Sequence, residues 1–218
     1  MPKKWGEKQN QLKSLLSTGE WDAAIALAAE MHASIHESSG GKNKTYEDLL
    51  WEGLRPEICR IITKQGRSIL WNIWHITRIE DLTANILIAD GSQVLNGEWL
   101  ERMRTQITDT GNAMTNEEVA EFSNEIEIEE LRKYRREVGL QTRKILKKLK
   151  ADDLKKKMRK DQLDRILSEG GVLNAADSVW LLDFWGRKTV SGLLTMPITR
   201  HQESHVNDSF KIKSRYNK

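Results

Sequence analysis

The chain has 218 residues, a length typical of one domain, and we expect a single domain over residues 1–218 with its core at about 20–212. A hydrophobic fraction of 38% and eight tryptophans supply enough apolar surface for a core, which excludes wholesale disorder. The net charge of +3 is too small to indicate nucleic-acid binding by itself, and the single cysteine excludes an intramolecular disulfide.

Helical periodicity accounts for most of the first half of the chain. Ser68 is a typical cap for the longest helix there, and this helix carries apolar residues on several faces, including Trp71 and Trp74. We therefore expect it to be central and mostly buried. The predicted elements are a helix at 20–37, a loop at 38–44, and helices at 45–54, 56–65 and 69–90.

The second half of the chain is also predicted to be helical. Thr115 and Glu118 form a capping-box pattern at the start of a long helix, in which Gly139 is the candidate for an interruption. Pro197 is expected in the first turn of the last helix. The predicted helices are 97–107, 116–150, 152–169, 175–190 and 198–213. With only three prolines and no useful alternating strand pattern, the sequence predicts an all-α four-helix bundle with short accessory helices.

Three of the five histidines form a candidate metal site. His201 and His205 lie four residues apart in a predicted helix, so their Cβ atoms should be about 5–6 Å apart on one face. That spacing suits two imidazoles binding one ion. His75 is the best third ligand, because a lone histidine in the apolar middle of a helix is costly to bury. Simpler roles stay open: a solvated helix face for the pair, and a core histidine bonded to a carbonyl for His75.

The other two histidines, His32 and His36, are also four residues apart. Because His36 adjoins the predicted loop, we interpret this pair as a helix end that favours a positive side chain. His32 could still approach the candidate metal site as an outer-shell group.

Two segments resemble the DinB-like superfamily of metal-binding helical bundles. RPEICRIITKQGRSILWNIWHITRIED is similar to its tryptophan-flanked metal histidine, and WLLDFWGRKTVSGLLTMPITRHQESHVND to its terminal His-x-x-x-His helix. The resemblance covers residues 20–212 in order. It implies a four-helix bundle with one divalent transition metal (Zn, Ni or Fe) on His75, His201 and His205.

The chain departs from the family pattern at two positions near the ligand pair. Ser204 stands where the family often has a further histidine, and Asp208 where it often has glutamine. These departures weaken the transfer of a particular activity more than they weaken the metal site. Asn72 could orient a ligand, whereas no carboxylate, including Glu80 and Asp208, is identified as catalytic.

Three neutral imidazoles would leave the ion's charge uncompensated and a coordination position open, which can lower the pKa of bound water towards about 7 or bind a thiolate. The resemblance accordingly implies either a metal-dependent hydrolase or a transferase that uses a low-molecular-weight thiol, acting on a small molecule. The sequence does not choose between them. Relatives of this shape could also pair through an outer helix as homodimers.

Two other classes of protein stay open. One is a non-enzymatic metalloprotein, and the other a nucleic-acid or membrane-surface binder that uses Arg143–Lys160, where ten basic residues face two acidic ones. A solvated helix face explains this run more simply, because residues 117–130 are comparably acidic. The N-terminal sequence MPKKWGEKQNQLKSLL lacks an apolar signal core, and no run of about 18 apolar residues exists, so we expect a cytoplasmic protein without a membrane span.

Overall fold

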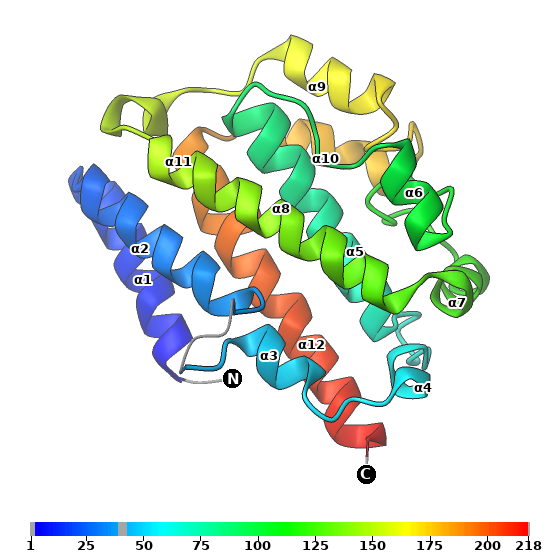
Figure 1. Cartoon of the computed structure of the whole chain (residues 1–218). Helices are drawn as coiled ribbons and strands as arrows, with labels where there is room; N and C mark the ends of the chain where they lie inside the picture. The colour runs from blue at the N-terminus through cyan, green and yellow to red at the C-terminus, as the bar shows by residue number, and fades with distance from the viewer. Residues whose placement is uncertain (1–2, 39–42, 218) are drawn as a thin grey trace.

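A computed structural model describes residues 3–38 and 43–217, and it is all-α, as predicted. Each of the four bundle helices packs on two others: α8 lies between α2 and α5, and the helical segment ending in α12 lies between α5 and α2 (Figure 1). These helices are α2 (Trp21–Ile35), α5 (Ile69–Asp81), α8 (Ile128–Lys148) and α12 (His201–Tyr216). Residues 39–42 of the predicted loop lie outside the described residues.

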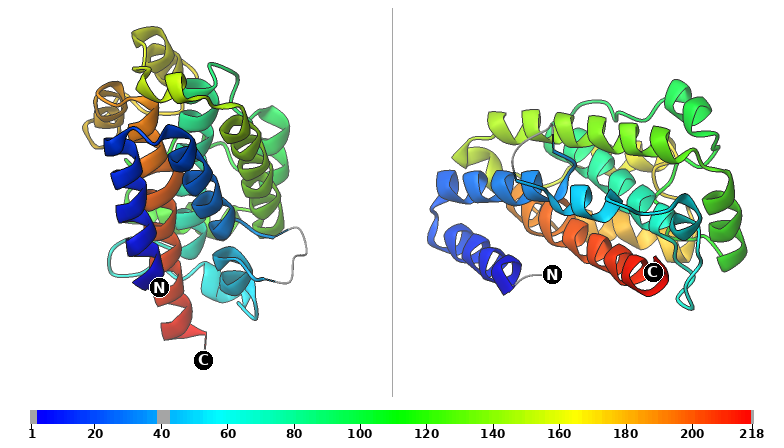
Figure 2. Two further views of the ribbon diagram at one scale, coloured as in Figure 1. Left: turned by 90° about the vertical axis from the view of Figure 1, so that its left-hand side faces the viewer. Right: turned by 60° about the horizontal axis from the view of Figure 1, so that its bottom comes forward.

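A helix precedes the predicted core: α1 (Lys3–Thr18) packs on the outer side of α2 (Figure 2). Its mostly polar sequence gave no basis for predicting it. Among residues 5–18 of this helix, whose burial the structure describes, Trp5, Gln9 and Leu12 are buried, at a spacing of three to four residues. Gln9 also donates through Nε2 to the carbonyl of Thr195, at 2.9 Å. The bundle therefore has a fifth long helix along one edge.

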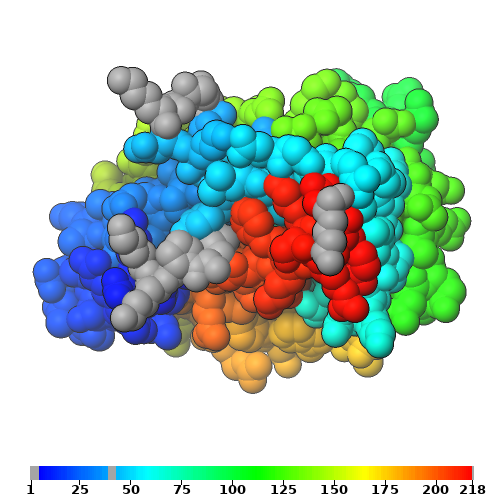
Figure 3. All heavy atoms as spheres, turned by 90° about the horizontal axis from the view of Figure 1, so that it is seen from below, coloured from blue at the N-terminus to red at the C-terminus, as the bar shows by residue number. Residues whose placement is uncertain are grey.

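Short helices close the ends of the bundle. Thr45 and Asp48 form a reciprocal capping box on α3, and Ser68 accepts from the Trp71 N–H at the start of α5, as the sequence predicted. The last turns of α12 lie against α3 and α4 (Figure 3). The accessory helices are α3 (Tyr46–Trp51), α4 (Pro56–Cys59), α6 (Gly97–Met103), α9 (Lys160–Ser168) and α10 (Ala176–Gly186).

The predicted helix at 116–150 is two helices, α7 (Asn116–Glu125) and α8, and Gly139 does not interrupt α8. The break falls at residues 126–127, where Arg60 donates to the carbonyls of Ser123, Asn124 and Ile126. Because this guanidinium satisfies carbonyls that a continuing helix would use, α7 ends there. The predicted helix at 152–169 is also shorter: a 3₁₀ turn, η2 (Ala151–Lys155), precedes α9.

Two π-helical segments lie within the long helices. Helix α5 continues as η1 (Leu82–Ile88), and η3 (Met196–Arg200) joins α11 (Val190–Thr195) to α12. Pro197 therefore lies inside a continuous helical run and not in its first turn. Proline lacks an N–H and cannot make the regular helical bond, which favours a local departure from α geometry. Among the described residues, no helix combines the length and apolar character needed to cross a membrane.

Candidate metal centre

The packing of α5 against α12 brings the three predicted histidines together. His75 lies on α5, and His201 and His205 lie one turn apart at the start of α12. Their ring centroids are 4.6–5.0 Å apart in all three pairs. The Nε2 atoms of His75 and His201 are 3.2 Å apart. Two nitrogens bound at about 2.0–2.1 Å to one tetrahedral ion would be separated by nearly this distance.

Hydrogen bonds orient two of these rings with a free Nε2. His75 Nδ1 lies 2.7 Å from the carbonyl oxygen of Thr110, and His205 Nδ1 lies 2.8 Å from Asn72 Oδ1. Both oxygens can only accept, so each Nδ1 carries the proton and each Nε2 presents a lone pair. A second-shell acceptor on the distal nitrogen is the usual arrangement for a metal-bound histidine. Asn72 thus has the orienting geometry that its spacing suggested.

Burial keeps the three imidazoles neutral, which metal binding requires. The pKa of His75 is lowered to about 4, mainly by burial and further by Arg67, although the bond to Thr110 opposes the change. Burial and the neighbouring imidazoles also lower the pKa values of His201 and His205 well below the usual range. No proton therefore competes for these nitrogens at neutral pH.

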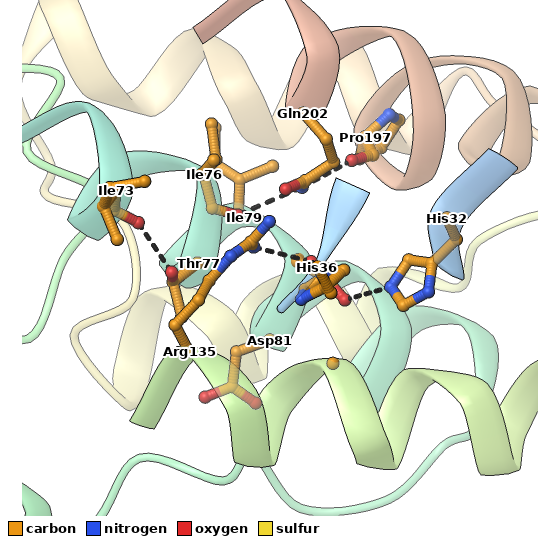
Figure 4. A network of polar contacts seen from close by, with 12 residues as sticks. His32, His36, Ile73, Ile76, Thr77, Ile79, Asp81, Arg135, Pro197 and Gln202 are labelled. Atoms are coloured by element: carbon orange, nitrogen blue, oxygen red, sulfur yellow. Dashed lines mark hydrogen bonds and ion pairs between the residues drawn. The ribbon is translucent and has the colours of Figure 1, made fainter. Parts of the chain in front are cut away.

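Packing fixes the site from two further sides. The indole of Trp71 stacks on the His75 ring at a centroid distance of 4.7 Å and an interplanar angle of 8°. The Gln202 amide donates to the carbonyls of Ile76 and Pro197, at 3.2 and 2.9 Å, which ties α12 to α5 beside His201 (Figure 4). These contacts hold the two helices in the register that the three histidines need.

A second buried group, formed by His32, His36 and Glu80, could also hold an ion on geometric grounds. Glu80 Oε1 lies 2.6 Å from His32 Nε2, and its Oε2 lies 3.0 Å from His36 Nε2 and 2.8 Å from Arg135 Nη1. Figure 4 shows both histidines and Arg135 converging between α2, α5 and α8. The sequence had placed Glu80 on a different face from His75, and no local pattern connects it to residues of α2.

In this second group, the ring nitrogens that face Glu80 carry protons for hydrogen bonds and are not free to bind a metal ion. A carboxylate only accepts, so both Nε2 atoms donate to Glu80, and both Nδ1 atoms are buried without a partner in the described structure. Burial would raise the pKa of Glu80, but His36, His32 and Arg135 hold it well below the usual range. Arg135 already supplies a cation. The pair lies at the end of α2, as predicted, but the expected positive charge at His36 is wrong, since burial and Arg135 lower its pKa to about 3.

The other carboxylates near the candidate site have partners of their own. Asp208 lies 2.8 Å from Lys211 Nζ and 3.6 Å from Arg67. Asp81, next to Glu80, pairs with Arg78 and accepts from the Tyr134 hydroxyl, both at 2.9 Å or less. Asp81 is thus held in a buried ion pair, whereas Asp208 forms ion pairs at the surface.

A cavity of about 240 Å³ reaches two of the three histidines. His75 and His201 line it together with residues of the α5 core, the loop before α7, helix α10 and the π segment η3. The remaining lining residues are Ile79, Asn112, Trp180, Leu181, Phe184, Trp185, Met196 and Pro197.

The described part of the chain is thus a helical bundle with two groups of side chains that could hold a metal ion. A model of the DinB superfamily matches residues 44–206, three quarters of the chain, and the protein belongs to that superfamily. The family resemblance expected from the two motif segments is thus confirmed, and both segments overlap the matched range. A search of curated proteins found no significant match to the chain.

Proposed function

We propose that His75, His201 and His205 bind one divalent transition metal (Zn, Ni or Fe) and that the protein is a metal-dependent enzyme acting on a small molecule. The proposal depends mainly on one observation. Two of the three rings donate through Nδ1 to fixed acceptors, Thr110 O and Asn72 Oδ1, which leaves their Nε2 lone pairs directed at a common centre. In the second group, His32 and His36 donate to the same carboxylate, Glu80, which is already paired with Arg135.

The cavity favours catalysis over a purely structural ion, because it gives a small molecule access to His75 and His201. An ion on three neutral imidazoles would act as a Lewis acid that activates a thiol or water at neutral pH. No carboxylate is among the residues that line the described cavity, so the site has no evident base for water. A thiol-dependent transferase is therefore our first choice, and a metal-dependent hydrolase the second.

The test is metal analysis of three matched proteins: the parent, His201→Gln/His205→Gln and His32→Gln/His36→Gln. Both double variants replace two histidines spaced by four residues, and glutamine preserves a hydrogen-bond donor. We expect about one metal equivalent in the parent and in the His32 variant, and none in the His201 variant, while circular dichroism shows all three to be helical. Metal retained by the His201 variant and lost from the His32 variant would refute the proposed site.

A further inference from the structure

The cavity beside the candidate centre has the chemistry of an apolar binding site. Seven of its ten lining residues are apolar, and four of these are on α10, namely Trp180, Leu181, Phe184 and Trp185. The polar ones are His75, His201 and Asn112, and both imidazoles are kept neutral by burial. None of these lining residues carries a formal charge.

The two ends of the cavity differ. Leu181 and Trp185 are buried at its inner wall, whereas Trp180 is 48% exposed and packs edge-on against Phe184, at a centroid distance of 6.0 Å. An exposed tryptophan beside a histidine-lined cavity indicates a mouth through which an apolar group can enter. A volume of about 240 Å³ exceeds the roughly 150 Å³ cavity that accommodates benzene in another protein.

Asn112 supplies the one amide at the wall. Its Oδ1 accepts from the Thr110 hydroxyl at 2.8 Å, and the carbonyl of the same Thr110 holds His75. Its Nδ2 makes no hydrogen bond within the described part of the chain, and Asn112 is only partly buried. This amide can therefore donate to an acceptor atom of a bound molecule next to His75.

We infer that the substrate is a compact, uncharged molecule: an aromatic or branched apolar body in this cavity, one hydrogen-bond acceptor near Asn112, and a donor atom facing the ion. The inference depends on the proposed function for the last of these features only. Burial of a charged group of the substrate in this cavity would leave its charge unpaired, at high cost. The neighbouring larger cavity, lined by Lys64, Arg67, Lys211 and Arg215, includes none of the three histidines.

The probes are imidazole and 4-phenylimidazole, titrated into the cobalt-loaded protein and followed by the cobalt visible bands. Both can bind the ion through the same nitrogen, and only the second presents a ring to the cavity. We expect 4-phenylimidazole to bind at least about tenfold more tightly, because the phenyl ring leaves water. Equal affinities would overturn the inference while leaving the metal site intact.

Two variants, each with a new aspartate, test whether the preference for the phenyl ring arises in this cavity. Phe184→Asp places a charge in the cavity wall and should abolish the preference for the phenyl ring without changing imidazole binding. Leu173→Asp is the matched control, since Leu173 is an apolar residue that is 42% exposed and does not line this cavity. Loss of the preference in both variants, or in neither, would contradict the assignment.

An experiment on the metal-free protein tests the apolar cavity separately from the proposed metal site. Fluorobenzene binding to the metal-free protein, followed by ¹⁹F NMR, should be detectable in the parent and in Leu173→Asp and absent in Phe184→Asp. If cobalt does not bind but fluorobenzene does, the proposed metal site fails and the apolar cavity stands. If fluorobenzene fails to bind the folded parent, the apolar site is refuted whatever the metal result.

Discussion

At the scale of single residues, the candidate centre depends on hydrogen-bond acceptors outside the three histidines. Asn72, three residues before His75 on α5, accepts from His205 on α12 and so connects two helices that each supply candidate ligands. The backbone carbonyl of Thr110, in a loop 35 residues away, accepts from Nδ1 of His75. The orientations of His75 and His205 are thus set by neighbours that are distant in sequence or on another helix.

Asn72→Ala should weaken metal binding about 10–100-fold, because His205 loses the acceptor that fixes its proton on Nδ1. The measurement is competition with a chelator of known affinity. Asn207→Ala is the control: Asn207 is on the same helix as His205 and donates to Glu203, a residue outside the centre. An equal loss of affinity in both variants would show that Asn72 has no specific role.

The metal-free protein should lose stability as the pH falls from about 6.5 to about 4. The pKa of His75 is about 4 in the folded state, against 6.5 in an unfolded chain, because burial disfavours its charged form and Arg67 adds repulsion while Thr110 partly offsets both. The unfolded state binds more protons than the folded state between pH 4 and 6.5. The stability that neutral His75 contributes is therefore fully present above about pH 6.5 and is lost as the pH decreases.

Urea unfolding at several pH values tests this expectation. His75 alone should lower the free energy of unfolding by about 3 kcal/mol across this range. His75→Gln should reduce the slope of stability against pH over the same range. An unchanged slope in that variant would assign the pH dependence to other groups, such as buried His36.

At the scale of elements, one glycine sets the distance between α2 and α8. A Cβ atom built on Gly139 would lie 2.4 Å from Nδ1 of the His36 ring, too close for any real contact. The glycine that seemed a candidate helix break is instead the position where a helix accommodates a buried imidazole. Its role could not be read from the sequence, because the neighbour lies about a hundred residues earlier.

Gly139→Ala should destabilise the protein by about 1–3 kcal/mol, since the well-packed imidazole or the helix must move. Gly6→Ala, in helix α1, is the matched control, because a Cβ there meets nothing within 4 Å. That change should be neutral or stabilising by up to about 1 kcal/mol through the higher helix propensity of alanine. Chemical denaturation measures both, and similar effects in the two variants would contradict the packing argument.

At the scale of the whole molecule, a single buried guanidinium connects four helices. Arg135 on α8 pairs with Glu80 on α5 and with Glu47 on α3, and Glu80 in turn accepts from His32 on α2. All four side chains are buried. Burial raises the pKa of Glu47 in spite of Arg135, so this ion pair depends on close contact.

Arg135→Leu should cost about 3–5 kcal/mol, because it leaves buried carboxylates without a cation. Arg136→Leu is the control one residue later, where the partner is Glu37 and the guanidinium is largely exposed. That change should cost at most about 1 kcal/mol. Equal effects on the denaturation midpoint would show that the buried network does not hold the bundle together.

The sequence could predict whatever depends on local spacing. The bundle helices follow from apolar periodicity, the caps at Thr45, Ser68 and Thr115 from short-range patterns, and the gathering of the three histidines from spacing together with the family resemblance. It could not predict the break that Arg60 imposes on α7 or the pairing of Glu80 with α2, because both depend on contacts between distant segments.

Because the π segment η3 comes directly before His201, the candidate site depends on the number of residues in η3 as well as on their chemistry. Thr195, which precedes it, is held by Gln9 of α1, and His201 begins directly after it. Successive residues in an α-helix are turned by about 100°. A π turn holds about one residue more than an α turn, so removing one residue between 196 and 200 would let the run return to α geometry with His201 and His205 still facing His75. Adding one residue would keep every histidine in the chain yet turn His201 and His205 about a quarter turn away from His75, so insertions here should be tolerated far less than deletions or substitutions.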